Sequence, residues 1–237
     1  MTSSPSLQVI AMHGWSGDSR GWEPFVTATQ ALGWHWRTPE RGYGTLPEVP
    51  ASWEAAPTHG PAGRKVVIGH SLGPHLLPAA VLAQADAVVL LASFGRFIPE
   101  GREGRRLQSA LAGMAAALAG NEAEAMLRTF LGEAAAPQSV TELPATILDA
   151  PLPAAGRHRL QADLELLERC HSLPEALPAR APCLIVEAGA DRIVVPEARA
   201  LLRRERPDAQ VLTYPEAGHC LLGTPLVRDV ITWIEAL

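Results

Sequence analysis

Short apolar runs alternate with amphipathic or polar stretches along much of this chain. Five such runs lie at residues 7–12, 66–70, 86–92, 183–187 and 210–214, and their apolar side chains are mostly aliphatic. Apolar runs of this length are typical of strands that are buried on both faces of a parallel sheet. Five strands separated by helices predict a parallel sheet with right-handed crossovers.

The stretches between these runs predict helices and one further short strand. Residues 22–32 carry apolar side chains at helical spacing and end at Gly33, which predicts a helix that a glycine terminates. Residues 34–37 predict a short strand. Residues 196–204 predict a helix with a proline in its first turn, and residues 225–236 predict a closing helix.

The strand pattern stops after residue 93 and resumes near residue 179. Helical periodicity dominates between these points. A long helical insertion between two strands of a parallel sheet predicts a cap over the sheet edge, where it can close a pocket and exclude water. The predicted core therefore comprises residues 1–93 and 179–237, and the predicted cap comprises residues 94–178.

Two local signals refine the predicted helices. Asn121 followed by Glu124 resembles a capping box that would open a helix over residues 123–131. Pro78 lies within an apolar segment and should remove a helical hydrogen bond, which predicts a kink there.

The run at 66–70 leads into Gly-x-Ser-x-Gly at residues 69–73. A strand, a very tight turn and a helix around such a serine form a nucleophile elbow. The strained turn requires flanking positions without colliding side chains, and Gly69 and Gly73 meet that need. Ser71 would project its Oγ above the carboxyl edge of the sheet, where ligands of α/β folds bind. Because ordinary turns also show this pattern, its meaning depends on an acid and a histidine further along the chain.

An aspartate and a histidine follow in the expected order. Asp191 and His219 each lie in a loop after a predicted strand, so Ser71, Asp191 and His219 give the order nucleophile, acid, base. A serine hydroxyl is a poor nucleophile until a base takes its proton. A neutral imidazole suits that role, and a carboxylate fixes its tautomer and stabilises the imidazolium.

Other side chains compete for these roles. His70 is adjacent to the nucleophile and is expected to point elsewhere. Several histidines precede the last strand or lie outside the loop at its end, namely His13, His35, His59 and His75. Glu187 is still inside a strand, and Glu216 lies too close in sequence to His219. The pattern therefore favours Asp191 as the acid and His219 as the base.

The first apolar run ends in His13-Gly14-Trp15 and a polar loop. A loop at this position supplies one backbone N–H of an oxyanion hole in acyl-transfer enzymes of this shape, and the residue after the nucleophile supplies the other. This assigns Trp15 and Leu72 to the oxyanion hole. The alternative is a strand end with an aromatic anchor.

Length, composition and charge narrow the function classes. A chain of 237 residues with 47% hydrophobic side chains fits one large α/β domain. No run approaches the ~20 apolar residues of a membrane span. Residues 1–7 lack a basic start or a cleavage pattern, so we expect a cytoplasmic protein. The net charge of −5 gives no reason to expect a nucleic-acid partner.

The cysteines do not indicate a disulfide framework or a metal site, and we expect no metal or other cofactor. Cys170, Cys183 and Cys220 are widely spaced and odd in number. Cys220 is adjacent to His219, which leaves two interpretations, a thiolate site or a small apolar filler. The second is favoured because sequence neighbours do not point to the same place.

Five motifs together resemble the α/β-hydrolase superfamily over nearly the whole chain. They are His13-Gly14-Trp15, Gly69-His70-Ser71-Leu72-Gly73, Leu91-Ala92-Ser93-Phe94, Leu164-Glu165-Leu166-Leu167 and Asp191-Arg192-Ile193-Val194-Val195. Within the superfamily, the third and fourth resemble the pimeloyl-acyl-carrier-protein methyl ester carboxylesterases of biotin synthesis. The resemblance implies an α/β-hydrolase fold, with a mostly parallel sheet flanked by helices and a helical cap insertion. The chain departs from the common pattern at Pro74, where a third glycine often follows the elbow.

The resemblance also implies a specific activity. It is that of a serine carboxylesterase that cleaves the methyl ester of a pimeloyl chain carried on acyl carrier protein and releases methanol. The acyl chain would lie against Trp15, Ser93, Phe94, Phe97 and Phe130. The acidic carrier would contact cap arginines, for which the chain offers Arg102, Arg105, Arg106 and Arg128.

Plainer interpretations stand beside these assignments. The phenylalanines also suit ordinary core positions, and the arginines also suit a solvated helix face. Two alternative functions stay open, a hydrolase of small esters or thioesters in other metabolism, and a non-catalytic ligand-binding protein on the same fold.

Overall fold

A computed structural model of the chain describes residues 7–54 and 63–237. Residues 1–6 and 55–62 lie outside the described residues. They include His59 and most of the N-terminal segment on which the expected cytoplasmic location depends.

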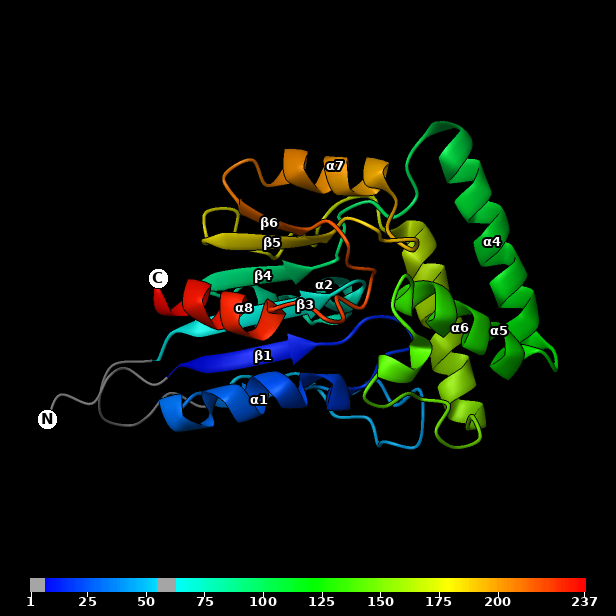
Figure 1. Cartoon of the computed structure of the whole chain (residues 1–237), viewed down its shortest axis with the longest axis horizontal. Coiled ribbons are helices and arrows are strands. Elements are labelled where there is room, and N and C mark those ends of the chain that lie inside the picture. The colour runs from blue at the N-terminus through cyan, green and yellow to red at the C-terminus, as the bar shows by residue number, and fades with distance from the viewer. Residues whose placement is uncertain (1–6, 55–62) are drawn as a thin grey trace, which may run out of the picture.

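A parallel sheet forms the centre of the molecule (Figure 1). In the described part of the chain it has six strands in the order β2-β1-β3-β4-β5-β6, and every pair is parallel. The prediction of five strands was wrong by one, because the short strand predicted at 34–37 joins the sheet beside β1. The strands are β1 (Gln8–Met12), β2 (His35–Arg37), β3 (Lys65–His70), β4 (Ala87–Leu91), β5 (Cys183–Ala188) and β6 (Gln210–Tyr214).

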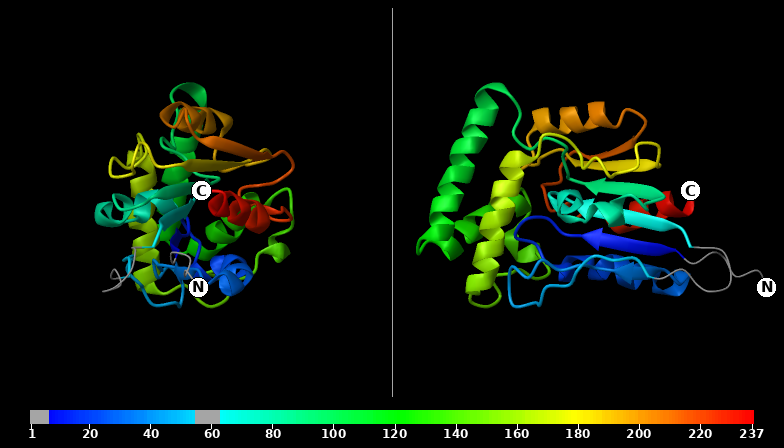
Figure 2. Two further views of the ribbon diagram at one scale, coloured as in Figure 1. Left: turned by 90° about the vertical axis from the view of Figure 1, so that its left-hand side faces the viewer. Right: turned by 180° about the vertical axis from the view of Figure 1, so that it is seen from behind.

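Helices cover both faces of the sheet (Figure 2), and successive strand residues supply the two faces in turn. On one face, Val66 and Ile68 pack in a cluster with α1 (Glu23–Thr29) and α8 (Leu226–Glu235). On the other face, Val67 packs with side chains of α3 (Ala79–Leu82) and α7 (Pro196–Glu205). Burial on both faces explains why the central strands read as continuous apolar runs.

The elements around the sheet mostly follow the sequence pattern. Gly33 has a φ of 68° and terminates the 3-10 turn η2 (Gln30–Leu32) that extends α1. The kink predicted at Pro78 is a complete break, because α2 (Gly73–Leu76) ends before it and α3 begins after it. Pro78 cannot donate a helical hydrogen bond, and its ψ of 142° is extended.

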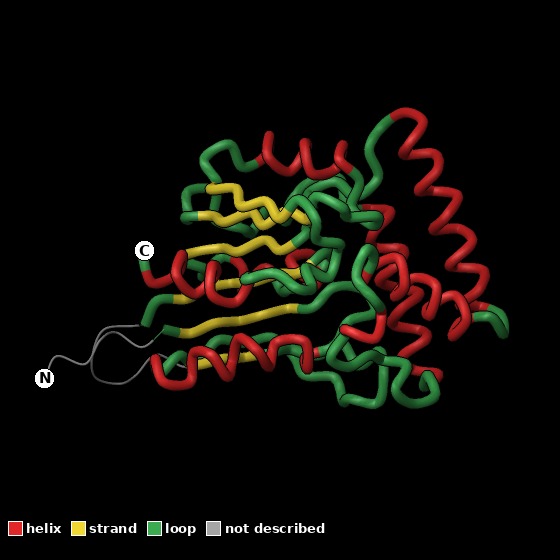
Figure 3. The backbone as a smooth tube through the Cα atoms, in the orientation of Figure 1, coloured by secondary structure: helices red, strands yellow, loops and turns green. Residues whose placement is uncertain are grey.

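The segment between β4 and β5 forms a helical cap at the carboxyl edge of the sheet (Figures 1 and 3). Its helices are α4 (Gly101–Ala119), α5 (Ala123–Ala135) and α6 (Ala154–Arg169), with the 3-10 turn η3 (Val140–Glu142). The capping box predicted at Asn121 and Glu124 is absent, because Glu122 occupies the N-cap of α5 and no side chain caps it. The cap limits of 94 and 178 stay a prediction. No helix among the described residues combines the length and the apolarity that a bilayer crossing requires.

A buried polar cluster joins the cap to the core. Asp163 of α6 accepts two hydrogen bonds from the Arg41 guanidinium, at 2.9 and 2.8 Å, and a third from the Tyr43 hydroxyl at 2.5 Å. The Trp15 indole N–H also donates to the Leu160 carbonyl oxygen of α6, at 2.8 Å. These bonds connect loops after β1 and β2 to one face of α6. Because the Asp163 carboxylate is buried and paired, removing either partner leaves an uncompensated polar group.

We expect Asp163→Ala to lower the free energy of unfolding by about 3–5 kcal/mol, because the buried Tyr43 hydroxyl and the half-buried Arg41 guanidinium would lose their acceptor. Glu165→Ala is the matched control on the same helix, since its pair with Arg169 is exposed. The control should change stability by less than about 0.5 kcal/mol. Urea unfolding of both variants measures the difference, and equal losses would contradict the importance of this cluster.

Candidate active site

Ser71 lies in a strained turn between β3 and α2, as predicted. Its φ is 54°, in the left-handed region, and its backbone N–H donates to the Leu91 carbonyl oxygen of β4 at 2.9 Å. A Cβ at Gly73 would collide with the Met12 carbonyl oxygen of β1, and one at Gly69 would collide with the ring of Pro74. The proline that replaces the usual third glycine therefore lies in space that Gly69 leaves free.

Ser93 supports this turn from behind. Its buried hydroxyl donates to the Ser71 carbonyl oxygen at 2.7 Å. The hydroxyl thus holds the elbow to the loop after β4, and Ser93 is not among the residues that line the cavity described below.

Asp191 and His219 meet at the same edge of the sheet. The imidazole Nδ1 of His219 donates to Oδ2 of Asp191 at 2.9 Å, and both side chains are buried. The other oxygen, Oδ1, accepts the backbone N–H groups of Ile193 and Val194 at 2.7 and 2.9 Å. Burial acts to raise the pKa of Asp191, but the imidazole and the two N–H groups outweigh it and lower the pKa overall. The carboxylate is therefore ionised and fixed in orientation.

This bond determines the chemistry available to His219. With its proton on Nδ1, the neutral ring keeps Nε2 as a bare acceptor, which is the state a general base needs. The Ser71 hydroxyl forms no hydrogen bond with His219 among the described residues. Nucleophile–base bonds are often long before substrate binds.

His70 does not point away from the site, contrary to the expectation. Its ring centroid lies 4.9 Å from that of His219, and its Nε2 donates to the His219 backbone carbonyl oxygen at 3.0 Å. Burial and the neighbouring His219 lower the pKa of His70 to about 4, so the ring is neutral near pH 7. No sequence pattern identifies this contact, because it joins two loops that are distant in the chain.

The two predicted oxyanion-hole donors have free N–H groups. Among the described residues, neither the Trp15 nor the Leu72 backbone N–H has a protein acceptor. Trp15 lies in a turn closed by a 3.1 Å bond from Gly17 N to Gly14 O. In the same turn Ser16 has a φ of 59°, a value that glycine adopts more readily. Free backbone donors in a rigid turn are what a developing oxyanion requires.

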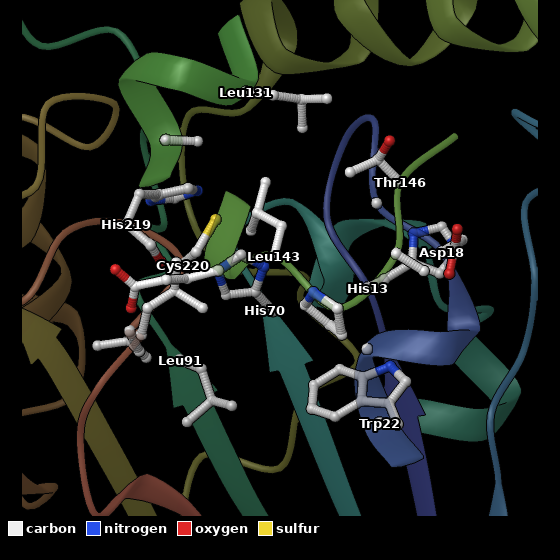
Figure 4. Close-up of a pocket in the computed structure, with 18 of the residues that line it drawn as sticks. His13, Asp18, Trp22, His70, Leu91, Leu131, Leu143, Thr146, His219 and Cys220 are labelled. Atoms are coloured by element: carbon white, nitrogen blue, oxygen red, sulfur yellow. Dashed lines mark hydrogen bonds between the residues drawn. The ribbon is translucent and has the colours of Figure 1, made fainter. Parts of the chain in front are cut away.

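A cavity of about 410 Å³ opens beside the turn at Trp15 and the ring of His219 (Figure 4). His13, Trp15, His70, Phe130 and His219 contribute to its wall. Ser71 is not in the wall itself but directly follows His70, which is. Cys220 also lines the cavity, and burial raises the pKa of its thiol to about 12. A thiol with that pKa stays protonated near pH 7, which favours the apolar-filler interpretation.

The predicted substrate-lining aromatics separate into two groups. Phe130 lines the cavity and packs edge-on against Trp15, with ring centroids 4.9 Å apart. Phe94 and Phe97 are buried against each other in the cluster between cap and sheet, outside the cavity wall.

The cap arginines lie on α4 and α5. Arg106 pairs with Glu103, and Arg128 pairs with Glu124, in exposed bridges along their own helices. Arg102 and Arg105 form no ion pair with any described residue. The positive charge available to a partner is therefore concentrated in the first turns of α4.

Comparison with known proteins identifies the family of this chain. A model of the alpha/beta hydrolase family matches residues 9–228. No curated protein sequence matches the chain.

Solved structures show the same architecture at low sequence identity. The enol-lactonase from Burkholderia xenovorans LB400 is similar with a TM-score of 0.71 and 15% identity, over 99% of this chain and 94% of that chain. An esterase from Exiguobacterium antarcticum is similar with a TM-score of 0.69 and 14% identity, over 98% of this chain and 92% of that chain. A thermophilic esterase from Thermogutta terrifontis is similar with a TM-score of 0.61 and 20% identity, over 98% of this chain and 91% of that chain.

The half-buried, neutral His70 should make stability depend on pH. Its pKa falls from 6.5 in an unfolded chain to about 4 in the fold. Between these values the unfolded state binds more protons, so stability falls as the pH drops through this window. His70→Gln removes this titration.

We therefore expect the wild type to lose about 2 kcal/mol more stability than His70→Gln between pH 7 and pH 4.5. Urea unfolding of both proteins at the two pH values measures this difference. Parallel losses in the two proteins would show that the fold does not hold His70 in the neutral form.

Proposed function

The chain belongs to the alpha/beta hydrolase family, and from this premise we propose that it is a serine carboxylesterase with the catalytic triad Ser71, Asp191 and His219. Family membership and the parallel sheet flanked by helices confirm the predicted fold class. One observation carries the proposal: the Asp191–His219 hydrogen bond lies at the sheet edge where the Ser71 elbow ends, with rings of His70 and His219 in contact. An orienting carboxylate, a base and a strained serine are the three parts that acyl transfer needs.

The residues assign themselves to steps of ester hydrolysis. Ser71 Oγ attacks the carbonyl carbon of the ester while His219 Nε2 takes the hydroxyl proton. The N–H groups of Trp15 and Leu72 donate to the oxyanion that forms. The C–O bond to the alcohol then breaks, and the alcohol leaves with the proton from His219. Water, deprotonated by His219, attacks the acyl-serine. The bond between the acyl carbon and Ser71 Oγ then breaks, His219 returns the proton to Oγ, and the carboxylic acid is released.

The cavity supports a carboxylic ester with an apolar part as the substrate class. Phe130, Leu131 and Leu143 contribute apolar wall, and His13, His70 and His219 contribute polar wall. An apolar chain would gain free energy by leaving water there.

Ser71→Ala should lower kcat for a short p-nitrophenyl ester by at least about 10⁴-fold, because the nucleophile is lost. Asp191→Asn should lower kcat by about 10³–10⁴-fold. The asparagine oxygen would face the N–H groups of Ile193 and Val194, so its NH₂ group would face His219 and impose the wrong tautomer. Initial rates and circular dichroism test both variants, and a fully active, folded Ser71→Ala would refute the triad.

For the substrate itself we propose the methyl ester of a pimeloyl chain on acyl carrier protein, as in biotin synthesis, with the carrier on the cap. The support is the motif resemblance together with the unpaired Arg102 and Arg105 near the start of α4. Unpaired guanidinium groups suit an acidic carrier, whereas the paired Arg106 and Arg128 have less charge to offer. The alternative is a hydrolase of small free esters, and two of the similar solved structures are esterases.

Charge reversal separates these alternatives. Changing Arg102 and Arg105 to Glu should raise KM for the carrier-bound methyl ester by about tenfold, since a tenfold change in binding corresponds to about 1.4 kcal/mol. The same variant should hydrolyse free dimethyl pimelate at the wild-type rate. Arg37→Glu with Arg228→Glu is the control, because these exposed arginines lie on β2 and α8. Equal effects on both esters, or no hydrolysis of the carrier-bound ester by the wild type, would refute the proposal that the substrate is bound to acyl carrier protein.

A further inference from the structure

The loop that carries His219 is held from two sides. On the cap side, the Cys220 N–H donates to the Ala134 carbonyl oxygen of α5 at 3.1 Å. On the core side, His70 Nε2 donates to the His219 carbonyl oxygen at 3.0 Å. The His70 contact joins the backbone of His219 to the end of β3, the strand that leads into Ser71.

The chemistry of this contact fixes the tautomer of His70. A carbonyl oxygen can only accept a hydrogen bond, so Nε2 must carry the proton. The low pKa of about 4 that burial gives His70 keeps the ring neutral near pH 7, so Nδ1 carries none. The ring is therefore a neutral donor with one defined proton and places no charge beside His219.

The position of His70 in the chain gives the contact its value. His70 is the last residue of β3, pairs with Leu91 of β4, and directly precedes Ser71. A bond from this residue ties the base to the backbone of the nucleophile. In catalysis a displacement of about 1 Å can cost about 10²-fold in rate.

We propose that His70 is a positioning residue, whose Nε2–H holds the His219 backbone so that the imidazole keeps its place between Asp191 and Ser71. The inference rests on the proposed serine esterase activity, because only a reaction that uses His219 as a base depends on this placement. Asp191 fixes the ring of His219 through its side chain, and His70 fixes the same residue through its main chain.

Three substitutions separate hydrogen bonding from packing. Gln places its amide NH₂ near the position of Nε2 and can keep the bond. Leu fills much of the space without a donor, and Asn carries an amide that is too short to reach. We expect His70→Leu and His70→Asn to lower kcat for a p-nitrophenyl ester by about 10–100-fold with KM within about twofold, and His70→Gln to stay within about threefold.

The pattern across the variants decides the outcome. If Leu matches wild type, or if Gln is as impaired as Asn, the ring acts by packing and the proposal fails. Thermal unfolding identifies any variant that does not fold, and Asn replaces Leu in the comparison if the leucine variant is the one lost.

A second measurement does not depend on activity. In a long-range ¹H–¹⁵N spectrum of histidine-labelled wild-type protein near pH 7, His70 should appear as the pure Nε2–H tautomer, assigned by its loss in His70→Gln. The Nδ1–H tautomer, or a mixture, would overturn the proposal. The expected tautomer in a protein whose Ser71→Ala variant keeps full esterase activity would instead refute the triad and, with it, the catalytic meaning of this contact.

Discussion

The parallel pairing of β3 between β1 and β4 is the constraint from which the site follows. Met12 lies opposite Gly69, and Leu91 lies opposite His70, so the loops after all three strands leave the sheet at one level. The turn with the proposed oxyanion-hole donor Trp15, the elbow and the loop with Ser93 therefore adjoin each other. The next two strands add Asp191 and His219 to the same edge. Parallel strands bring their carboxyl ends together, and the side chains in those loops can then act on one substrate.

Close packing makes this edge rigid. The turn at Ser71 passes so near β1 that Gly73 has no room for a Cβ, and Pro74 fills the space above Gly69. The Ser93 hydroxyl holds the carbonyl oxygen of Ser71, and the Leu91 carbonyl oxygen holds its backbone N–H. The proposed nucleophile on this turn therefore has little backbone freedom left to lose, which is the physical benefit of a strained and over-determined backbone.

Two buried polar pairs lie at this edge, and they have different consequences. The Asp163 cluster joins cap and core and offsets the cost of burying charge with three short hydrogen bonds. The hydrogen bonds of the Asp191–His219 pair fix its orientation, because backbone N–H groups hold Oδ1 and the imidazole holds Oδ2. His70 adds a neutral hydrogen-bond donor. A positively charged donor at the same position would lower the proton affinity of His219.

The chain alone predicted most of the elements and the three residues of the proposed triad. Continuous aliphatic runs predict buried parallel strands, glycines at 69 and 73 predict the elbow, and the order of Ser71, Asp191 and His219 predicts their roles, because each signal is local. Tertiary structure decided what depends on contacts between distant segments. It placed His70 against His219, Ser93 behind the elbow, and Phe94 in the core while Phe130 lines the cavity. Residue type and spacing do not encode which way a side chain faces once cap and sheet pack together, and that packing alone selects the neighbours.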